Sequence, residues 1–552
     1  MFSALLAALL LLAGCYLTTT LTSRKKHPPL PPGPPRRPII GNLNDLPRPG
    51  QQDWKHWLKH KELYGPISSL SVLGQTIIIL NEARHAVELL EKRSAIYSSR
   101  PQQNFAEMSG WHNVLGSVKS TDRLRATRKN LHREIGSNKS VARFDAVQTA
   151  EVGRFLMRVL EAPGRLMEHI RKETGAIILK IGYGYTVEPH GRDPLVELAD
   201  RAMEDFSVAM LPATYLVDYI PFLRHLPPWL PGGSFIRTAR GYKQTVTAFS
   251  DLPYAFVRHQ MHHASGRHTP SFLSNLLAHQ PALPPGSEAE VTVKWSAASL
   301  YAGGADTTVS SIATFFLAMA LFPDVQRNAQ AELDSVLGAA ERLRLPTFAD
   351  RENLPYLNAL IKEVFRWHPV VPMDISHVVT QEDEYKGFRI PKGASVLANI
   401  WAFTHDPDVY PDPEAFRPER FLPDAAAAAA AAAAAPGAGD GDEGGGGGSG
   451  VQRDPHLLVF GFGRRVCPGR TLADANVYLT IAQALTVFRI QEPNGNPDWT
   501  PEFLPGVISH PVVPAGLRIE ARSEAHAALV REVEGAYPFE KSHSGVLVGL
   551  SY

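Results

Sequence analysis

The sequence has very little cysteine. Only Cys15 and Cys467 occur among its 552 residues, and Cys15 lies in an apolar N-terminal run. The folded body therefore has one thiol, which excludes an internal disulfide and a zinc site built from cysteines. An excess of charge is absent too, because 56 Lys and Arg balance 55 Asp and Glu. With 44% hydrophobic residues, this near-neutral chain is neither disordered nor a nucleic-acid-coating protein, and we expect no nucleic-acid partner.

Long hydrophobic runs are scarce, but one stands at the N-terminus. Residues 2–21 carry no charge and, as a helix, would span about 30 Å, the thickness of a bilayer core. Arg24, Lys25 and Lys26 follow this run, and no basic residue precedes it, so the positive-inside bias places the body in the cytosol. The segment Leu12 to Cys15 also looks like a bacterial lipoprotein cleavage box, although such a signal would begin with basic residues. We predict a retained membrane anchor.

The remaining chain has no internal repeat, and its composition divides it into segments. We expect the anchor at 1–22, a basic and proline-rich linker at 23–38, one folded domain at 39–522 and a C-terminal tail at 523–552. Residues 424–452 consist largely of an alanine run followed by glycine and acidic residues. Such a composition cannot build a packed core, so we predict a solvated loop insertion.

Hydrophobic periodicity predicts a mainly α-helical body with small β-sheets. The strand-like runs are short and form an early and a late cluster. Helices are predicted at 83–92, 147–160, 165–181, 291–321, 324–337 and 470–487, and strands at 67–73, 76–80, 385–390, 395–399 and 517–521.

The lone cysteine of the body lies in a glycine-rich loop. Residues 460–470 read FGFGRRVCPGR, and a predicted helix begins just after them. Backbone N–H groups and the helix dipole would stabilise a Cys467 thiolate there, and the glycines would let the backbone approach a flat cofactor. Taken alone, Cys467 is equally well interpreted as a buried structural residue.

Two further motifs precede this loop. Glu363 and Arg366 form an ExxR pair on one helical face, and Arg420 lies in the run FRPERF at 416–421. The run AGGADTT at 302–308 places small residues, an acid and two hydroxyls inside a long apolar helix. Helix propensity gives no reason for such a run, which on its own would be a packing notch.

The three motifs together resemble those of the cytochrome P450 family over about residues 28–520. Within that family, the runs at 38–43, 90–98 and 506–511 resemble fungal microsomal enzymes similar to O-methylsterigmatocystin oxidoreductase. The resemblance implies the cytochrome P450 fold, mainly α with small β-sheets, preceded by one N-terminal transmembrane helix. It also implies a haem b cofactor whose iron takes the Cys467 thiolate as its axial ligand.

The resemblance further implies roles for individual residues. Asp306 and Thr307 would form the acid–alcohol pair that relays protons, and Glu363, Arg366 and Arg420 would form a buried structural network. The family usually has a tryptophan four residues before the position of Arg128, where this chain has Leu124. The expected haem-binding residues are Arg128, Gly303, His377, Phe460, Arg465 and Gly469, and the expected substrate pocket contains Phe105, Ala302, Val371, Ile375 and Val507.

The implied function is a haem-thiolate monooxygenase that oxidises a lipophilic small molecule, in fungal secondary metabolism by analogy. Because the chain has no flavin or nicotinamide fingerprint, electrons would come from NADPH-cytochrome P450 reductase, with cytochrome b5 as a second candidate donor. We expect a single-pass protein of the endoplasmic reticulum membrane with a cytosolic catalytic domain. A reductase-independent isomerase or dehydratase and a non-catalytic haem-binding paralogue are the alternatives, although the intact Asp306–Thr307 pair favours the monooxygenase.

Overall fold

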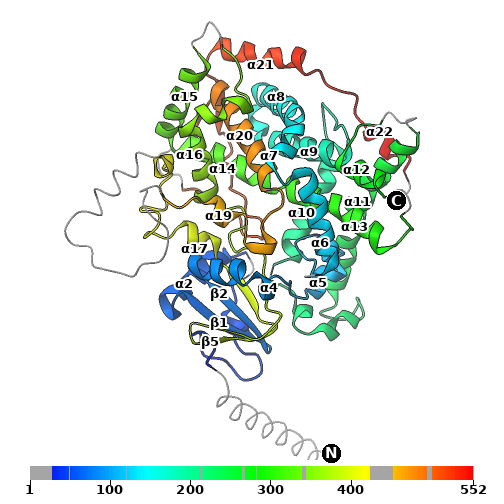
Figure 1. Cartoon of the computed structure of the whole chain (residues 1–552), viewed down its shortest axis with the longest axis vertical. Helices are drawn as coiled ribbons and strands as arrows, with labels where there is room; N and C mark the ends of the chain where they lie inside the picture. The colour runs from blue at the N-terminus through cyan, green and yellow to red at the C-terminus, as the bar shows by residue number, and fades with distance from the viewer. Residues whose placement is uncertain are drawn as a thin grey trace, which may run out of the picture.

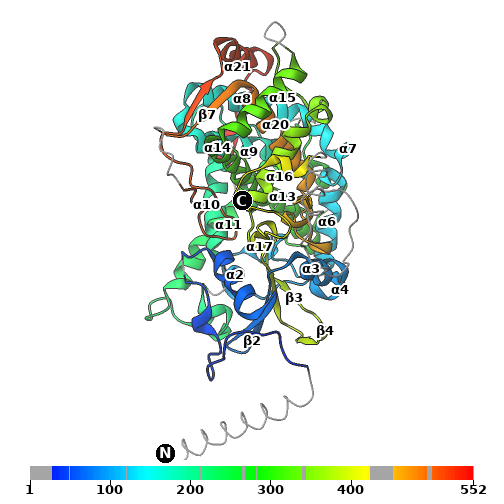
Figure 2. The same cartoon turned by 90° about the vertical axis from the view of Figure 1, so that its left-hand side faces the viewer.

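The computed structural model describes residues 28–48, 50–119, 121–211, 214–263, 268–280, 283–338, 343–422, 452–493 and 500–550. The predicted anchor at 1–22, the first part of the linker and nearly all of the insertion at 424–452 lie outside the described residues. Helices make up most of the described chain, and a small sheet lies at one end, near the first described residues (Figures 1 and 2).

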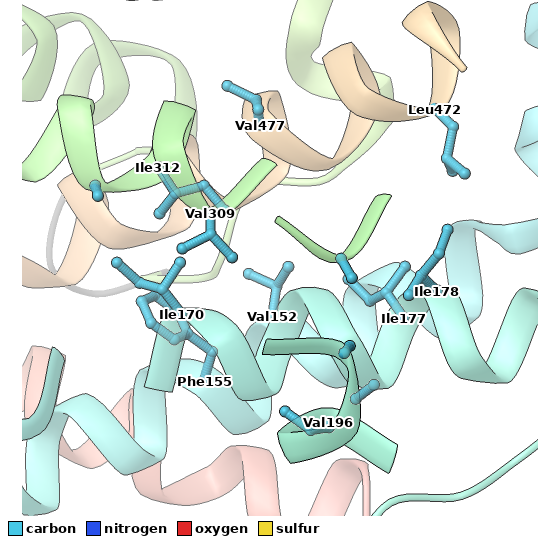
Figure 3. Packing of buried hydrophobic residues seen from close by; sticks show 14 of the residues in the cluster. Val152, Phe155, Ile170, Ile177, Ile178, Val196, Val309, Ile312, Leu472 and Val477 are labelled. Carbon is cyan, nitrogen blue, oxygen red and sulfur yellow. The ribbon is translucent and has the colours of Figure 1, made fainter. Parts of the chain in front are cut away.

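The centre of the molecule is a layer of long buried helices. Two of them, α13 (Glu288–Ala305) and α14 (Thr307–Leu321), continue one another and are separated only at Asp306. Against them pack α8 (Asp145–Glu161), α9 (Leu166–Tyr183) and α20 (Arg470–Val487). Figure 3 shows branched aliphatic side chains from these helices meeting in one core.

The helices around this layer have mostly amphipathic sequences, which explains why each buries one face. Their bounds are α2 (Asp53–Tyr64), α3 (Ala83–Ala86), α4 (Ser94–Tyr97), α5 (Asn104–Met108), α6 (Asp122–Ile135), α7 (Asn138–Val141), α10 (Pro194–Ala209), α11 (Ser234–His263), α12 (Phe272–Ala278), α15 (Pro323–Leu337), α16 (Pro355–Trp367), α17 (Ile400–Thr404), α19 (His456–Val459), α21 (Glu524–Ala536) and α22 (Ser544–Leu547). The helix predicted at 83–92 is α3 continued by a π-helical turn, Val87–Lys92.

The main sheet joins strands from both ends of the catalytic domain. Its order is β1 (Ile67–Val72), β2 (Gln75–Leu80), β6 (Ser395–Ala398) and β3 (His377–Val378). Strands β2 and β6 pair in parallel, with Ile78 opposite Val396, whereas the other two pairs are antiparallel. Of the predicted late strands, only the one at 395–399 joins the early strands in this sheet, and β3 was not predicted.

Two further pairs complete the β-structure of the described residues: β4 (Asp383–Tyr385) with β5 (Phe388–Ile390), and β7 (Phe488–Gln491) with β8 (Arg518–Ala521). The single strand expected at 385–390 is thus part of a hairpin. It turns at Lys386 and Gly387, whose φ angles of 51° and 78° end the extended run.

The described part of the linker and the C-terminal tail both pack on the body. The carbonyl of Pro32 accepts the Ser69 N–H of β1 at 2.8 Å, so residues 28–38 lie along the sheet. In the tail, α21 buries Val530 and Val533 against α8. Arg154 of α8 then donates to the carbonyl of Pro538 at 2.6 Å.

One helical run among the described residues, Glu288–Leu321, has the length and apolar composition of a membrane span. Within the protein, 78% of its most apolar window is buried, and it forms the central layer described above. We therefore identify it as a core helix.

Candidate functional site

A cavity of about 310 Å³ lies between the α13–α14 junction and the loop that carries Cys467. Most of its lining is apolar, with contributions from α9, α10, α14 and α20. The Cys467 side chain faces this cavity, and so do Gly303 and Thr307 on the opposite wall. The three sequence motifs therefore converge on one space, since the ExxR helix α16 also contributes Phe365 to the lining.

The cysteine loop is shaped by glycines and closed by a backbone bond. Gly461 and Gly463 have φ angles of 76° and 52°, and a Cβ atom at Gly463 would lie 2.5 Å from the carbonyl oxygen of Leu90. The Cys467 N–H donates to the Phe460 carbonyl at 2.8 Å. This geometry requires glycine at position 463, and it holds the sulfur against the cavity.

Opposing effects act on the Cys467 thiol. Burial raises its pKa, whereas hydrogen bonds from the N–H groups of Gly469 and Arg470 and the positive charge of Arg128 act to lower it. These N–H groups lie at the start of α20, where the helix dipole also favours negative charge. The loop is thus built to accept a thiolate once a positive centre compensates for burial.

Three arginines stand at the edge of the cavity. Arg465 donates to the carbonyls of Ser98 and Val118 at 2.7 and 2.6 Å, and burial lowers its pKa to about 9. Arg128 of α6 lines the cavity and has no ion-pair partner among the described residues. Leu124, one turn earlier, is buried in the protein, so the position that usually holds tryptophan faces inward but provides no hydrogen-bond donor.

The third arginine, Arg100, was not found by the sequence analysis. It is buried, lines the cavity, and donates to the carbonyls of Gly116 and Ser376 at 2.9 and 2.8 Å. Burial lowers its pKa to about 10. Because its partners lie 16 and 276 residues away in the chain, no local sequence motif identifies Arg100 as a site residue.

His377 is buried behind the cavity wall and is not itself part of the lining. Its Nδ1 lies 2.7 Å from the carbonyl of Tyr97. Its buried Nε2 has no hydrogen bond within the described residues, although the Asp374 carboxylate lies 3.4 Å away. The polar group that faces Nε2 is therefore the Asp374 carboxylate of the protein itself.

The α13–α14 junction presents different groups on its two sides. A Cβ atom at Gly303 would meet open space, whereas one at Gly304 would lie 2.6 Å from Cδ1 of Ile178. Gly303 therefore leaves room in the cavity, and Gly304 allows α13 to pack closely on α9. Thr307 donates to the Gly303 carbonyl at 2.5 Å. Asp306 does not line the cavity and instead pairs with His510.

Four of the five predicted substrate residues line the cavity: Ala302, Val371, Ile375 and Val507. Phe105 does not. It is fully buried and stacks on Tyr215, with ring centroids 3.4 Å apart. The structure therefore places Phe105 in the layer behind the cavity, and its predicted role remains a prediction.

The structure brings Glu363, Arg366 and Arg420 together. Arg366 donates to both carboxylate oxygens of Glu363 at 2.7 and 2.8 Å, and Arg420 approaches at 3.3 Å. The backbone N–H of Arg417 donates to the same carboxylate at 2.7 Å. All three predicted side chains are almost completely buried, so each charge depends on the others.

These residues fit a planar iron porphyrin. The cavity offers apolar walls for the ring, one thiol for the metal, and the guanidinium groups of Arg100, Arg128 and Arg465 for two carboxylates, whereas His377 lies behind the wall. A mainly helical body with a single thiol facing such a cavity defines a haem-thiolate protein.

The comparisons with known proteins agree with this class. The Cytochrome P450 family profile matches residues 31–515. The cytochrome P450 monooxygenase ppsD of Aspergillus oryzae is 47% identical over 552 residues, which cover 99% of each chain. The O-methylsterigmatocystin oxidoreductase of Aspergillus flavus is 40% identical over 98% of this chain and 97% of its own. The monooxygenase claR of Ampulloclitocybe clavipes is 42% identical over 91% and 88%.

The chain belongs to the cytochrome P450 family and is a cytochrome P450 monooxygenase. Its cofactor is haem b, held through a cysteine thiolate as in other members of the family. Among the described residues Cys467 is the one free cysteine.

Proposed function

We propose that this monooxygenase inserts oxygen into a lipophilic small molecule of fungal secondary metabolism, at a haem bound by Cys467, with electrons from a separate membrane-bound reductase. The observation that carries the proposal is the convergence of the Cys467 sulfur, Gly303 and Thr307 on one apolar cavity. The relatives from Aspergillus and Ampulloclitocybe support the oxidative reaction.

When bound, the haem supplies dioxygen activation at a thiolate-ligated iron. The residues that would hold it are Cys467 at the metal, Phe460 and Gly469 beside the sulfur, and Arg128, Arg465 and His377, joined by Arg100, near the two carboxylates. Gly303 leaves space on the opposite face. Glu363, Arg366 and Arg420 stabilise the helix that lies against the cysteine loop.

The proton-handling groups lie on the far wall from the sulfur. Thr307 presents its hydroxyl near the Gly303 carbonyl, and Asp306 is the adjacent acid. We assign proton delivery to this pair, because a hydroxyl next to a carboxylate can pass a proton toward the cavity. The remaining apolar lining, which includes Ala302, Val371, Ile375 and Val507, suits a lipophilic substrate.

The electron donor would dock near α6, on the cysteine side of the molecule. The structure divides the basic cluster there: Arg128 faces the cavity, Arg123 pairs with Glu288, and Arg125 pairs with Asp122. Arg125, Lys129 and Arg133, the last paired with Glu134, are exposed and would meet an acidic reductase surface. NADPH-cytochrome P450 reductase fits this requirement, and cytochrome b5 is a second acidic candidate.

Attachment to the endoplasmic reticulum membrane would come from residues 1–22 and from an apolar patch on the body. We define this lower patch by Ile39, Leu216, Ile220, Phe222 and Trp229, whose exposed fractions run from 41% to 86%. The segments that carry them lie at the end of the molecule where the described chain begins (Figures 1 and 2). A bilayer would cover these side chains and admit a lipophilic substrate from the same side.

The deciding experiment compares the full-length protein with Cys467→Ser. The wild type is expected to show the absorption of a thiolate-ligated, reduced carbon monoxide complex, and the variant is expected to lose it. With reductase and NADPH, the wild type should add one oxygen atom to members of a terpenoid, indole and polyketide library, detected by mass. An unchanged spectrum in the variant would overturn the ligand assignment, and oxygen-independent turnover would favour an isomerase or dehydratase.

A further inference from the structure

A short hairpin lies between the cavity and Asp306, the acidic residue at the α13–α14 junction. It runs from Glu502 to Val512: the Leu504 N–H donates to the His510 carbonyl and the Val512 N–H to the Glu502 carbonyl, both at 2.8 Å. At the tip of this hairpin, Val507 and Ile508 line the cavity. A molecule that fills the cavity therefore contacts the same hairpin that carries His510.

The base of the tip is fastened to two other elements. The Ser310 hydroxyl of α14 donates to the Ser509 carbonyl at 2.6 Å. The Ser509 N–H donates to the carbonyl of Val370, which also lines the cavity. Ser509 is fully buried, and it connects the tip directly to its neighbour His510.

His510 binds the carboxylate of Asp306 with both oxygens in reach. Its Nε2 lies 3.1 Å from Oδ1 and 3.2 Å from Oδ2, and the exposed fractions of the two side chains are only 18% and 15%. The buried Nδ1 of His510 has no hydrogen bond within the described residues. The pair lies outside the cavity lining, whereas Thr307, the next residue, lies within it.

Other charged groups near the pair do not replace His510. Arg171 lies 3.7 Å from Asp200, whose carboxylate is close enough to sense the charge of Asp306. His368 approaches the Ser509 carbonyl at 3.3 Å. Among the described residues, His510 is the one basic side chain within ion-pair distance of Asp306.

We propose that His510 is a positioning residue that holds the Asp306 carboxylate outside the cavity, and that a substrate pressing on Val507 and Ile508 releases this carboxylate toward Thr307. The inference rests on the proposed function, because it takes Asp306 as the acid of the proton-delivering pair. It adds that delivery waits for occupancy of the cavity, which would limit the waste of electrons in the empty enzyme.

The first test measures NADPH oxidation and hydrogen peroxide release by the reductase-supported holoenzyme without substrate. His510→Ala should raise both by about tenfold, because the acid is no longer held away. His510→Gln places an amide nitrogen near the position of Nε2 and should stay close to wild type. Adding Asp306→Asn to His510→Ala should abolish the increase, a reversal that a merely structural defect would not show. The matched control is His279→Ala at an exposed helix end.

The second test needs no turnover. A double-mutant cycle of His510→Ala and Asp306→Asn, read as melting temperature of the holoenzyme, should be non-additive in the ligand-free protein. The coupling should shrink with clotrimazole, a ligand large enough to contact Val507 and Ile508 once its binding is confirmed by a spectral shift, and persist with the much smaller imidazole. Additive shifts, or a coupling that clotrimazole leaves unchanged, would overturn the proposal. Failure of the proposed function would appear separately, as a wild type without a thiolate-type spectrum or oxygenated product.

Discussion

At the residue scale, the Glu363 carboxylate collects four donors and has no contact with solvent. The arginines were predictable as a set because ExxR and the downstream FRPERF run are local motifs. That both arginines bind the same carboxylate was not predictable, since Arg420 is separated from Glu363 by 57 positions in the sequence. This arrangement makes the energetic cost of losing one partner much larger than that of losing a surface pair.

Arg366→Ala is expected to lower the free energy of unfolding by about 3–5 kcal/mol, because it leaves the Glu363 charge buried without its bidentate partner. Arg366→Lys should lower the free energy of unfolding less, since lysine keeps the positive charge but cannot bind both carboxylate oxygens as the guanidinium does. The matched control is Arg417→Ala, whose exposed side chain pairs with Asp412 and should change stability by less than about 0.5 kcal/mol. Equal effects of the alanine variants in urea unfolding would contradict the assigned role.

His456 supports a second prediction at this scale. Burial alone would lower its pKa, but hydrogen bonds with Asp454 and Asp474 raise it to about 9. Since its ordinary pKa is 6.5, this interaction stabilises the fold fully below pH 6.5, and the stabilisation is lost as the pH rises through about 9. The maximum contribution is about 3 kcal/mol. The ring also stacks on Phe460, with centroids 5.6 Å apart, which places the charge beneath the cysteine loop.

The unfolding free energies of the wild type and His456→Gln should therefore differ most at pH 6.5 and converge toward pH 9. Urea titrations across this range provide the measurement. His279→Gln, on an exposed helix end, is the control and should follow the wild-type profile. A difference that stays constant with pH would show that the His456 imidazole is not held in its charged form.

At the scale of elements, α8, α9, α15 and α20 were predicted from the sequence, whereas the long helices α10 and α11 and the pairings between distant segments were not. The helix predicted at 470–487 matches α20 to the residue: the glycine loop precedes its first turn, and its second half is buried on all sides. The parallel pairing of β2 with β6 and the fastening of the hairpin at Ser509 join segments far apart in sequence. Short strands carry no local signal of their partner, so these contacts appear only in the fold.

The low-complexity insertion leaves and re-enters the body at neighbouring points. The Gln452 N–H donates to the Arg420 carbonyl at 3.2 Å, so the two described ends of this loop already meet. Replacing residues 424–450 by four Gly and Ser residues should preserve the carbon monoxide spectrum. It should also raise the free energy of unfolding by about 1–2 kcal/mol, because a shorter loop costs less closure entropy.

A control variant with the same residues 424–450 in shuffled order should match the wild type in spectrum and stability. Loss of the haem spectrum on shortening, with retention on shuffling, would mean that the insertion has a length-dependent role in the fold.

At the scale of the whole molecule, the lower patch gives one end of the body an apolar surface. A variant without residues 1–27 should still float with vesicles of phosphatidylcholine and phosphatidylserine, because Phe222 and Trp229 expose 75% and 77% of their surface at that end. Phe222→Asp with Trp229→Asp in this shortened chain should lower the bound fraction by about tenfold or more.

The matched control is Val548→Asp, an exposed apolar residue of the C-terminal segment with an exposed fraction of 91%. It should leave flotation unchanged. Equal binding of the double variant and the shortened parent would show that the lower patch does not face the bilayer, and would leave the anchor as the sole attachment.

The hairpin at 502–512 also bears on how this enzyme can be altered. Val507 and Ile508 line the cavity, and they belong to the same hairpin as His510, the ion-pair partner of Asp306. In the proposed scheme, substrate selectivity and the coupling of electron consumption to product formation both depend on this one hairpin. Substitutions at Val507 and Ile508 that are selected for a new substrate are expected to yield many variants that consume NADPH without forming product. Compensating substitutions should then accumulate around His510 and Ser310.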